Sequence, residues 1–357
     1  MTADTVGGVW TYTCELVRAL APFGVDVTIA TMGREPTTAQ RREADALPNA
    51  RLVSSEFALE WMRDPWRDVD SAGEWLCGVA RHLQPDIVHV NGYAHAGLRF
   101  DAPVVCVAHS CVCSWHRAVR GQAAPAEWNE YRRRVTMGLF SADRVVAPTH
   151  ALARMVKAEY GAELDIRVIA NGRDPDLWTT GPKEPFVLSA GRLWDEAKGL
   201  QMLDAAAARV SWPIYVAGPT EGPRGFDCIS TGGVAMLGEL DRESLAGWMS
   251  RAAIYALPAR YEPFGLSVVE AALSGCALVL GRIDSLHEVW GDCAVYVRTD
   301  EPDALAAALD TLAQDPLRRR TLAAAARARA LQLTPARMAT SYHALYTELL
   351  GAATEVA

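Results

Sequence analysis

The chain has 357 residues, of which 50% are hydrophobic and 22% are charged, and this composition excludes a mainly disordered protein. At roughly 150 residues per domain, the length predicts two domains with a cleft between them. The net charge is −8, and no basic run is long enough to hold a nucleic-acid backbone or an anionic bilayer. We therefore expect no nucleic-acid partner and no stable membrane insertion.

Residues 1–8 lack the basic and apolar regions of a secretory signal, and no run of about 18 apolar residues occurs anywhere in the chain. Eight cysteines lie scattered in apolar surroundings, which indicates reduced and mostly buried thiols. The pair Cys111 and Cys113 has no second pair to complete a zinc site, so ordinary packing is favoured. We expect a cytoplasmic protein.

The first elements in chain order are a loop over residues 2–8 and a helix over 9–20. An α/β domain normally starts with a strand that leads into such a glycine-containing loop, and no strand is predicted here. We expect either that this strand lies upstream of Met1 or that the first sheet lacks it.

From residue 25 onward, short β-branched runs alternate with amphipathic stretches, as in parallel sheets crossed by helices. The segment 171–185 gathers Gly, Pro and Asp without apolar periodicity, which predicts a linker between two α/β halves. Two helices are predicted near the end, over 317–331 and 336–350. Strands are predicted at 25–30, 86–90, 103–108, 144–148, 165–170, 185–190, 213–218, 253–258, 277–281 and 294–297.

The segment 256–270, ALPARYEPFGLSVVE, is predicted to be a buried strand, a loop and then a helix that starts near Pro263 and ends near Ser274. A helix start beyond the carboxyl end of a strand attracts anions, because free N–H groups and the helix dipole point at it. Three backbone amides are therefore candidates to bind a phosphate or sugar hydroxyls: those of Phe264, Gly265 and Leu266.

Two carboxylates belong to the same segment, Glu262 in the loop and Glu270 in the helix. Glu270 shares a helix face with Ser267 and Ser274, and a carboxylate on an otherwise apolar helix needs a partner. Structural ion pairs and ligand binding both stay open for the two glutamates.

The segment 189–199, SAGRLWDEAKG, is predicted to bring Gly191 and Arg192 to the carboxyl end of a strand, with Lys198 and Gly199 opening the next helix. Two cations that converge there suit a diphosphate, because Arg offers a planar fork and Lys a mobile point charge. Either cation alone is typical of a solvated surface. Together with the segment 256–270 they favour an anion site.

The motifs GR-x5-KG and E-P-F-G-L-S-x-x-E resemble those of the retaining GT-B glycosyltransferases of family 4, which carry an E-x7-E motif. Segments 6–31, 85–92 and 145–156 are also similar to that family. The resemblance implies an α/β protein with the GT-B fold, in which two Rossmann-like domains face each other across a cleft and the last helix crosses back to the N-terminal domain. It implies an acceptor-binding domain, 1–172 plus 335–357, and a donor-binding domain, 173–334.

The resemblance also implies roles for the residues of these motifs. Arg192 and Lys198 would neutralise the diphosphate of the leaving nucleotide. Glu270 would accept hydrogen bonds from the ribose hydroxyls, and Glu262 would contact the transferred sugar near its 3-hydroxyl. The amides that follow Pro263 would hold the sugar and the distal phosphate.

In the first domain, Gly7 and Gly8 resemble the family's loop that lets the backbone approach the diphosphate and the acceptor. His109, after the strand 103–108, resembles the active-site histidine near the donor sugar, whereas His89 is expected to be structural. The catalytic set so implied is His109, Glu262, Arg192 and Lys198. The donor-binding set is Gly7, Gly8, Gly191, Arg192, Lys198, Glu262, Pro263, Phe264, Gly265, Leu266 and Glu270.

The implied reaction moves a hexosyl group from a nucleotide-diphosphate sugar to an acceptor hydroxyl with retention of configuration and without a protein nucleophile. The cations replace a metal, so we expect no metal and no cofactor besides the donor, with a UDP-sugar favoured over a GDP-sugar. The pair Asp68 and Asp70 lies in a polar stretch and is expected to be an accidental match to a metal-binding motif.

The acceptor is expected to be a carbohydrate or another small molecule. Segments 61–75 and 109–121 mix aromatic residues with Arg and His, which suits sugars or planar aglycones, while Arg117 and Arg120 suit an acidic acceptor. Core and interface packing of the tryptophans stays open. So do two other functions: a catalytically silent GT-B protein that binds nucleotide sugars, and a sugar phosphorylase or epimerase of the same fold.

Overall fold

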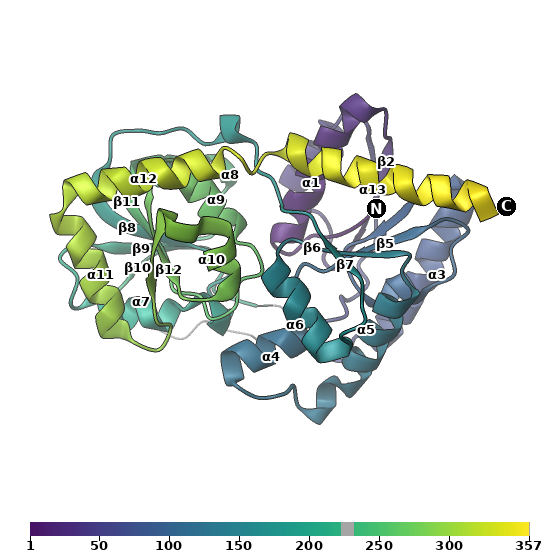
Figure 1. Cartoon of the computed structure of the whole chain (residues 1–357), viewed down its shortest axis with the longest axis horizontal. Coiled ribbons are helices and arrows are strands. Elements are labelled where there is room, and N and C mark those ends of the chain that lie inside the picture. Colours follow the sequence, from purple (N-terminus) through teal and green to yellow (C-terminus); the bar gives the residue numbers. More distant parts are fainter. Residues whose placement is uncertain (223–231, 357) are drawn as a thin grey trace. The chain divides into compact units, whose positions relative to one another are not determined.

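The computed structural model describes residues 1–222 and 232–356 (Figure 1). The chain divides into two compact units. Unit 1 consists of Met1–Gly172 and Pro335–Ala357, and unit 2 of Arg173–Thr334. Each unit is built on parallel strands covered by helices on both faces, which is the architecture of a Rossmann-like domain.

Unit 1 has two sheets, in the orders β3-β2-β1 and β4-β5-β6-β7, and every hydrogen-bonded pair of strands within them is parallel. β1 lies beside β4, and the Asn91 backbone N–H donates to Thr2 Oγ1 across this junction at 2.8 Å. The chain therefore reverses its direction of winding between β1 and β4. The strands are β1 (Thr2–Asp4), β2 (Val27–Met32), β3 (Ala50–Ser54), β4 (Val88–Val90), β5 (Val104–Val107), β6 (Arg144–Ala147) and β7 (Ile166–Val168).

The start of unit 1 corrects our expectation for residues 2–8, which we predicted to be a loop without a strand. Thr2–Asp4 pairs in parallel with β2, with Thr2 opposite Ala30. This strand has three residues, one of them a threonine and one an aspartate, so it offers too little apolar alternation to be recognised. The glycine loop follows directly after this strand and leads into α1.

The helices of unit 1 lie on both faces of its strands. Successive side chains of β2 point to opposite faces and pack against different helices. Ile29 packs with α1 and α2, whereas Ala30 and Met32 pack with α3. The last helix, α13, joins α1 over β5 and β6, where Tyr342 contacts Tyr12. The helices are α1 (Gly8–Leu20), α2 (Thr38–Asp45), α3 (Trp66–Leu83), α4 (Val112–Arg120), α5 (Asn129–Ser141), α6 (His150–Tyr160) and α13 (Pro335–Val356), with short 3₁₀ turns at Ala21–Phe23, Ala94–Gly97 and Ala126–Trp128.

Unit 2 has one parallel sheet in the order β10-β9-β8-β11-β12-β13. The first strand, β8, lies in the middle, and the chain winds outward from it in one direction and then in the other. The point of reversal, between β8 and β11, is where open α/β sheets bind ligands at the carboxyl ends of their strands. The strands are β8 (Glu184–Ala190), β9 (Ile214–Ala217), β10 (Ala235–Gly238), β11 (Ala252–Leu257), β12 (Ala277–Gly281) and β13 (Ala294–Val297).

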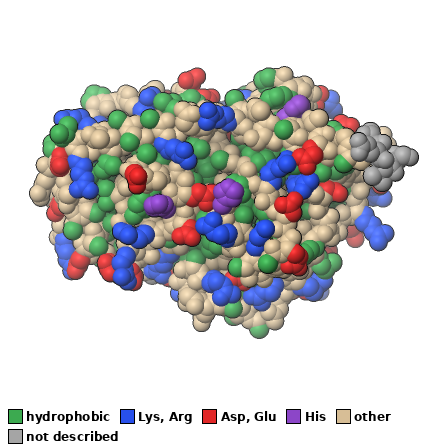
Figure 2. All heavy atoms as spheres, viewed as in Figure 1, with side chains coloured by type: hydrophobic (Ala, Val, Ile, Leu, Met, Phe, Trp, Pro, Cys, Tyr) green, Lys and Arg blue, Asp and Glu red, His purple; other side chains and the backbone are tan. Residues whose placement is uncertain are grey.

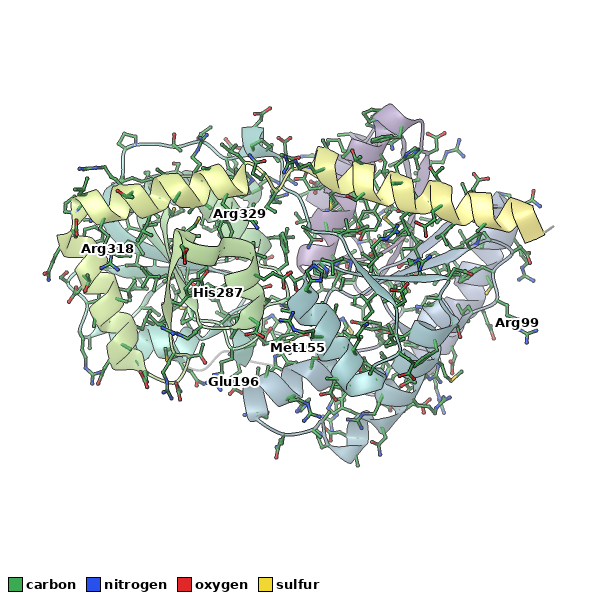
Figure 3. All side chains as sticks on the ribbon, viewed as in Figure 1. Arg99, Met155, Glu196, His287, Arg318 and Arg329 are labelled. Atoms are coloured by element: carbon green, nitrogen blue, oxygen red, sulfur yellow. The ribbon has the colours of Figure 1, made fainter. Side chains whose placement is uncertain are left out.

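Alternate residues of the central strands of unit 2 enter two separate cores. Tyr255 packs with α8, α9, α10 and α12, while its neighbour Ile254 packs with α7 and α11. Arg329 of α12, labelled in Figure 3, donates from Nε to the carbonyl of Val289 near the end of α10 at 2.8 Å. The helices are α7 (Leu200–Ala207), α8 (Arg242–Arg251), α9 (Leu266–Leu273), α10 (Asp284–Trp290), α11 (Pro302–Gln314) and α12 (Pro316–Ala330), with 3₁₀ turns at Pro175–Leu177, Glu196–Lys198 and Gly291–Cys293.

The segment 171–185, which we predicted to be a linker, is packed rather than solvated along much of its length. Asn171, Arg173 and Trp178 are buried, and β8 already begins at Glu184. The Arg173 backbone N–H donates to the carbonyl of Leu333 at 2.9 Å. This bond joins the two places at which the chain passes from one unit to the other.

On the face shown in Figure 2, Lys and Arg side chains are interspersed with Asp and Glu. Within the described residues, no helix combines the length and the apolar character needed to cross a bilayer. The described cysteines are unpaired in disulfides and most are buried, and Cys228 lies outside the described residues.

Candidate active site

The two segments singled out by sequence meet at the winding reversal of unit 2. Gly191 follows β8 and Glu262 follows β11, and these two strands are adjacent in the sheet. The predicted strand ends therefore bring the GR-x5-KG loop and the E-x7-E loop to the same edge.

Close backbone approach between the two loops depends on Gly199. This residue caps α7 with φ of +76°, and a Cβ there would lie 2.5 Å from the carbonyl oxygen of Pro258. A side chain at this position is thus excluded by conformation and by space. Lys198 immediately precedes Gly199 and is the last residue of the 3₁₀ turn Glu196–Lys198. The backbone position of Lys198 is therefore held by this turn.

Three contacts connect the loops. Lys198 Nζ lies 2.7 Å from Glu262 Oε2, and these side chains are only 11% and 14% exposed. The Arg260 backbone N–H donates to the carbonyl of Ala197 at 2.9 Å. Arg260 Nη1 also lies 3.2 Å from Oε1 of Glu196, which is labelled in Figure 3.

Arg192 is the more accessible of the two predicted cations, with a side chain that is 33% exposed. Its guanidinium lies 3.3 Å from Asp195 Oδ2 and 5.4 Å from the centre of the Trp194 ring. Both cations therefore lie beside a carboxylate, and Arg192 is the more exposed of the two.

The helix after Glu262 begins later than predicted, which corrects its expected start near Pro263. α9 begins at Leu266 and is capped by Gly265, whose φ is +89°. Of the three predicted amides, that of Phe264 donates to Glu262 Oε1 at 3.3 Å, and those of Gly265 and Leu266 lie at the helix start. The Glu262 side chain thus orders the same turn whose amides were expected to bind phosphate.

Glu270 is 8% exposed and is held by a residue that the sequence did not single out. Arg173 Nε lies 2.8 Å from Glu270 Oε1, and the Arg173 side chain is 4% exposed. Both glutamates of the E-x7-E motif therefore sit in ion pairs, which was the open structural alternative. An ion pair does not exclude ligand binding, because a carboxylate has about four acceptor positions.

Tyr255 of β11 connects the remaining parts of the site. Its hydroxyl lies 2.9 Å from the carbonyl of Ala190, next to Gly191, and 2.8 Å from Ser267 Oγ on α9. Burial raises the pKa of Tyr255, and the nearby carboxylates of Glu270 and Glu262 raise it further. The hydroxyl therefore stays protonated and fixes α9 against the GR loop.

The remaining predicted site residues, Gly7, Gly8 and His109, belong to unit 1. Gly7 has φ of 101° and caps α1, which begins at Gly8, and both glycines are exposed at the carboxyl end of β1. His109 follows β5, and its ring packs edge-on against Tyr12 of α1 with centroids 4.4 Å apart. The glycine loop, α1 and His109 are thus brought together in this unit.

His109 is bound by Asn91, the residue after β4. His109 Nε2 lies 2.8 Å from Asn91 Oδ1, and Asn91 Nδ2 donates to the carbonyl of Thr2 at 2.6 Å. Because the Thr2 carbonyl only accepts, the amide orientation is fixed and His109 must carry its proton on Nε2. Removal from water lowers the pKa of His109 to about 3, so the ring is neutral at physiological pH.

His89, which we expect to be structural, lies in the interior of unit 1. It is buried, its Nε2 lies 3.2 Å from the same Asn91 Oδ1, and its Nδ1 lies 2.7 Å from the Tyr346 hydroxyl of α13. Burial lowers the pKa of His89 well below its usual value. Asn91 could have been found from sequence, because it is a polar residue that directly follows a predicted strand, and that strand lies next to the winding reversal.

Residues considered for metal or acceptor binding have local structural partners. Asp68 accepts from the Ala58 backbone N–H at 2.9 Å, and Asp70 pairs with Arg134. Cys111 accepts from the Ser114 backbone N–H at the start of α4. On α4, Arg120 lies over Trp115 at 5.7 Å, and Arg117 pairs with Glu159.

Comparison with known proteins agrees with this arrangement. The model of Glycosyltransferase Family 4 matches residues 6–177, and that of Glycosyl transferases group 1 matches residues 184–315. The glycogen synthase of Mycobacterium tuberculosis is 27% identical over 91% of this chain and 86% of its own length. A D-inositol 3-phosphate glycosyltransferase of Xylanimonas cellulosilytica is 28% identical over 90% of this chain and 87% of its own.

Solved structures share the fold at lower identity. Sucrose-phosphate synthase from Thermosynechococcus elongatus superposes with a TM-score of 0.81 at 20% identity, covering 98% of this chain and 96% of that one. Anabaena HepE in complex with UDP-glucose gives 0.75 at 18% identity, covering 98% and 99%. The fold and the matched motifs define a glycosyltransferase with the GT-B fold. Within that class, the chain belongs to glycosyltransferase family 4.

Proposed function

We propose that this glycosyltransferase moves a hexosyl group from a nucleotide-diphosphate sugar to an acceptor hydroxyl, with retention of configuration and without a metal or further cofactor. The observation that carries the proposal is the pairing of Lys198 with Glu262 at the winding reversal of unit 2. It puts a cation suited to a diphosphate beside a carboxylate suited to sugar hydroxyls.

In the proposed reaction, the acceptor oxygen forms a bond to the anomeric carbon on the face from which the nucleotide diphosphate leaves. The bond from that carbon to the phosphate oxygen breaks, and the leaving phosphate takes the acceptor's proton. Lys198 and Arg192 stabilise the charge that develops on the diphosphate, which is the largest electrostatic contribution expected here. The neutral His109 serves as a hydrogen-bonding group toward the sugar rather than as an acid or base.

The identities of donor and acceptor are the finer parts of the proposal. We favour a UDP-sugar, a choice supported by the HepE neighbour solved with UDP-glucose. Unit 2 would bind the donor, with Glu270 on the ribose. Unit 1 would bind a carbohydrate or small-molecule acceptor in the cytoplasm, and the relatives named for D-inositol 3-phosphate support a small polar acceptor.

A thermal-shift panel with UDP-glucose, GDP-mannose and ADP-glucose tests the donor. A ligand at 100 times its dissociation constant should stabilise the protein by about 2.7 kcal/mol. Release of nucleotide diphosphate is then measured with and without EDTA, and product configuration is read by NMR. Saturable binding without turnover would favour a silent binding protein, and strict Mn²⁺ dependence or an inverted product would contradict the proposed mechanism.

A further inference from the structure

We propose that Arg173 is a positioning residue that sets how strongly Glu270 discriminates in favour of a donor ribose. The inference rests on the proposed function, because it assigns a determinant of specificity within the same nucleotide site. Arg173 acts through Glu270 and is not itself assigned a contact with the ligand.

The Arg173–Glu270 pair is buried, and its charged atoms lie close together. Nε of Arg173 lies 2.8 Å from Oε1 of Glu270, and the two side chains are 4% and 10% exposed. The partners are 97 positions apart in the chain, so their meeting is produced by the fold of unit 2. Removing one member of a buried pair leaves a buried charge without compensation, which is strongly unfavourable.

Arg173 is itself held from two other directions. Its guanidinium lies 5.3 Å from the centre of the buried Trp178 ring, and its backbone N–H donates to the carbonyl of Leu333. A planar guanidinium in such a setting fixes the direction of its N–H groups, which an ammonium on a flexible stem does not. The short ion pair with this anchored guanidinium therefore restrains the carboxylate of Glu270.

A carboxylate with a fixed orientation recognises a pair of neighbouring hydroxyls better than a mobile one, because no ordering is needed on binding. Hydrogen bonds to a charged group contribute about 1.5–3 kcal/mol, or roughly 10- to 100-fold in affinity. That contribution should depend on Arg173, because Arg173 restrains the carboxylate that makes it.

The test compares the affinities of UDP and 2′,3′-dideoxy-UDP by calorimetry in the full-length chain. In the wild type, loss of the two ribose hydroxyls should weaken binding by about 10- to 100-fold. In Arg173→Met the ratio should fall below about fivefold, and Arg173→Lys, which keeps the charge, should recover part of it. Arg173→Gln serves as a second neutral variant in case Arg173→Met lowers the folded fraction.

Arg251 offers a matched control in the same unit. It lies over Trp248 at 4.8 Å and pairs with Glu184 at 3.4 Å, so it has the same two kinds of contact on an exposed surface. Arg251→Met should leave the affinity ratio within twofold of the wild type. Glu270→Gln should lower the ratio, and combining it with Arg173→Met should lower it no further, because both changes act on one carboxylate.

The outcomes separate the two proposals. A wild type that binds no UDP overturns the proposed donor, and this inference falls with it. A wild type that discriminates, together with neutral Arg173 variants that fold and discriminate equally well, overturns the inference alone. A role limited to stability would lower the melting temperature and leave the ratio unchanged.

Discussion

Lys198 and Glu262 are 64 positions apart, yet their side chains form an ion pair with Nζ and Oε2 separated by 2.7 Å. The two groups that the proposed reaction needs for the diphosphate and for the sugar thus lie in contact with each other. A donor has to replace this contact with its own charges and hydroxyls. We therefore expect changes to this pair to alter both the affinity for the nucleotide and the activity.

Lys198→Ala should lower turnover by more than about 100-fold, which corresponds to about 2.7 kcal/mol of lost stabilisation of the leaving diphosphate. The measurement is the steady-state rate with saturating donor. Lys157→Ala, on α6 of unit 1, is the control and should stay within twofold of the wild type. Near-native turnover of Lys198→Ala would remove the assigned role.

Glu262→Gln should bind UDP about fivefold more tightly while transferring sugar at least tenfold more slowly. The affinity should rise because Lys198 no longer has to break its contact with a carboxylate to reach the phosphates, and fivefold corresponds to about 1 kcal/mol. Calorimetry with UDP checks the first effect and donor turnover the second. Glu196→Gln, which breaks the neighbouring pair with Arg260, should leave UDP affinity nearly unchanged, and equal gains in both variants would contradict this explanation.

The neutral state of His109 should make the protein less stable in acid. Its pKa is about 3 in the folded chain against 6.5 for the free group, so below pH 6.5 the unfolded chain binds the extra proton and stability falls as pH decreases. Between pH 7 and pH 5 the wild type should lose about 2 kcal/mol more than His109→Gln. Denaturant unfolding of both proteins at the two pH values measures this difference, and parallel losses would show that His109 titrates normally.

Gly218 should tolerate no side chain. Its φ is +137°, and a Cβ would lie 1.8 Å from the carbonyl oxygen of Gly191. We expect Gly218→Ala to destabilise unit 2 by more than about 3 kcal/mol, because one of two adjacent strand ends must move. Gly247→Ala, within α8 and with open space around its Cβ, should instead stabilise by up to about 1 kcal/mol. Similar melting temperatures for the two variants would refute the steric argument.

Sequence could predict the strands with short β-branched, apolar runs, and these include the edge strands β7 and β13. The structure contains a strand at each of the ten predicted places, and the differences are limited to residues at the ends. Three further strands escaped prediction: Thr2–Asp4, Ala50–Ser54 and Ala235–Gly238. All three lie at sheet edges, and they carry polar or exposed residues that weaken the apolar pattern.

Site residues were predictable where they belong to a motif whose residues are close together in the sequence, as Lys198 and Glu262 do. Arg173 was not, because it lies in a segment rich in Gly, Pro and Asp and its partner is far away in sequence. Asn91 was missed for a related reason, since its importance depends on Thr2 and His109 meeting it from two other strand ends. Contacts that the fold alone creates cannot be read from a single segment.

The position of α13 has a consequence for the order in which the protein folds on the ribosome. Tyr342 and Leu345 of this helix are fully buried against α1, and Tyr346 binds His89. Unit 2 is continuous in sequence and is synthesised before α13. The core of unit 1, in contrast, stays incomplete until α13 emerges, because side chains of α13 form part of that core. The usual order, in which the N-terminal domain folds first during synthesis, should therefore be reversed. The unit that is made first would be the last to become stable.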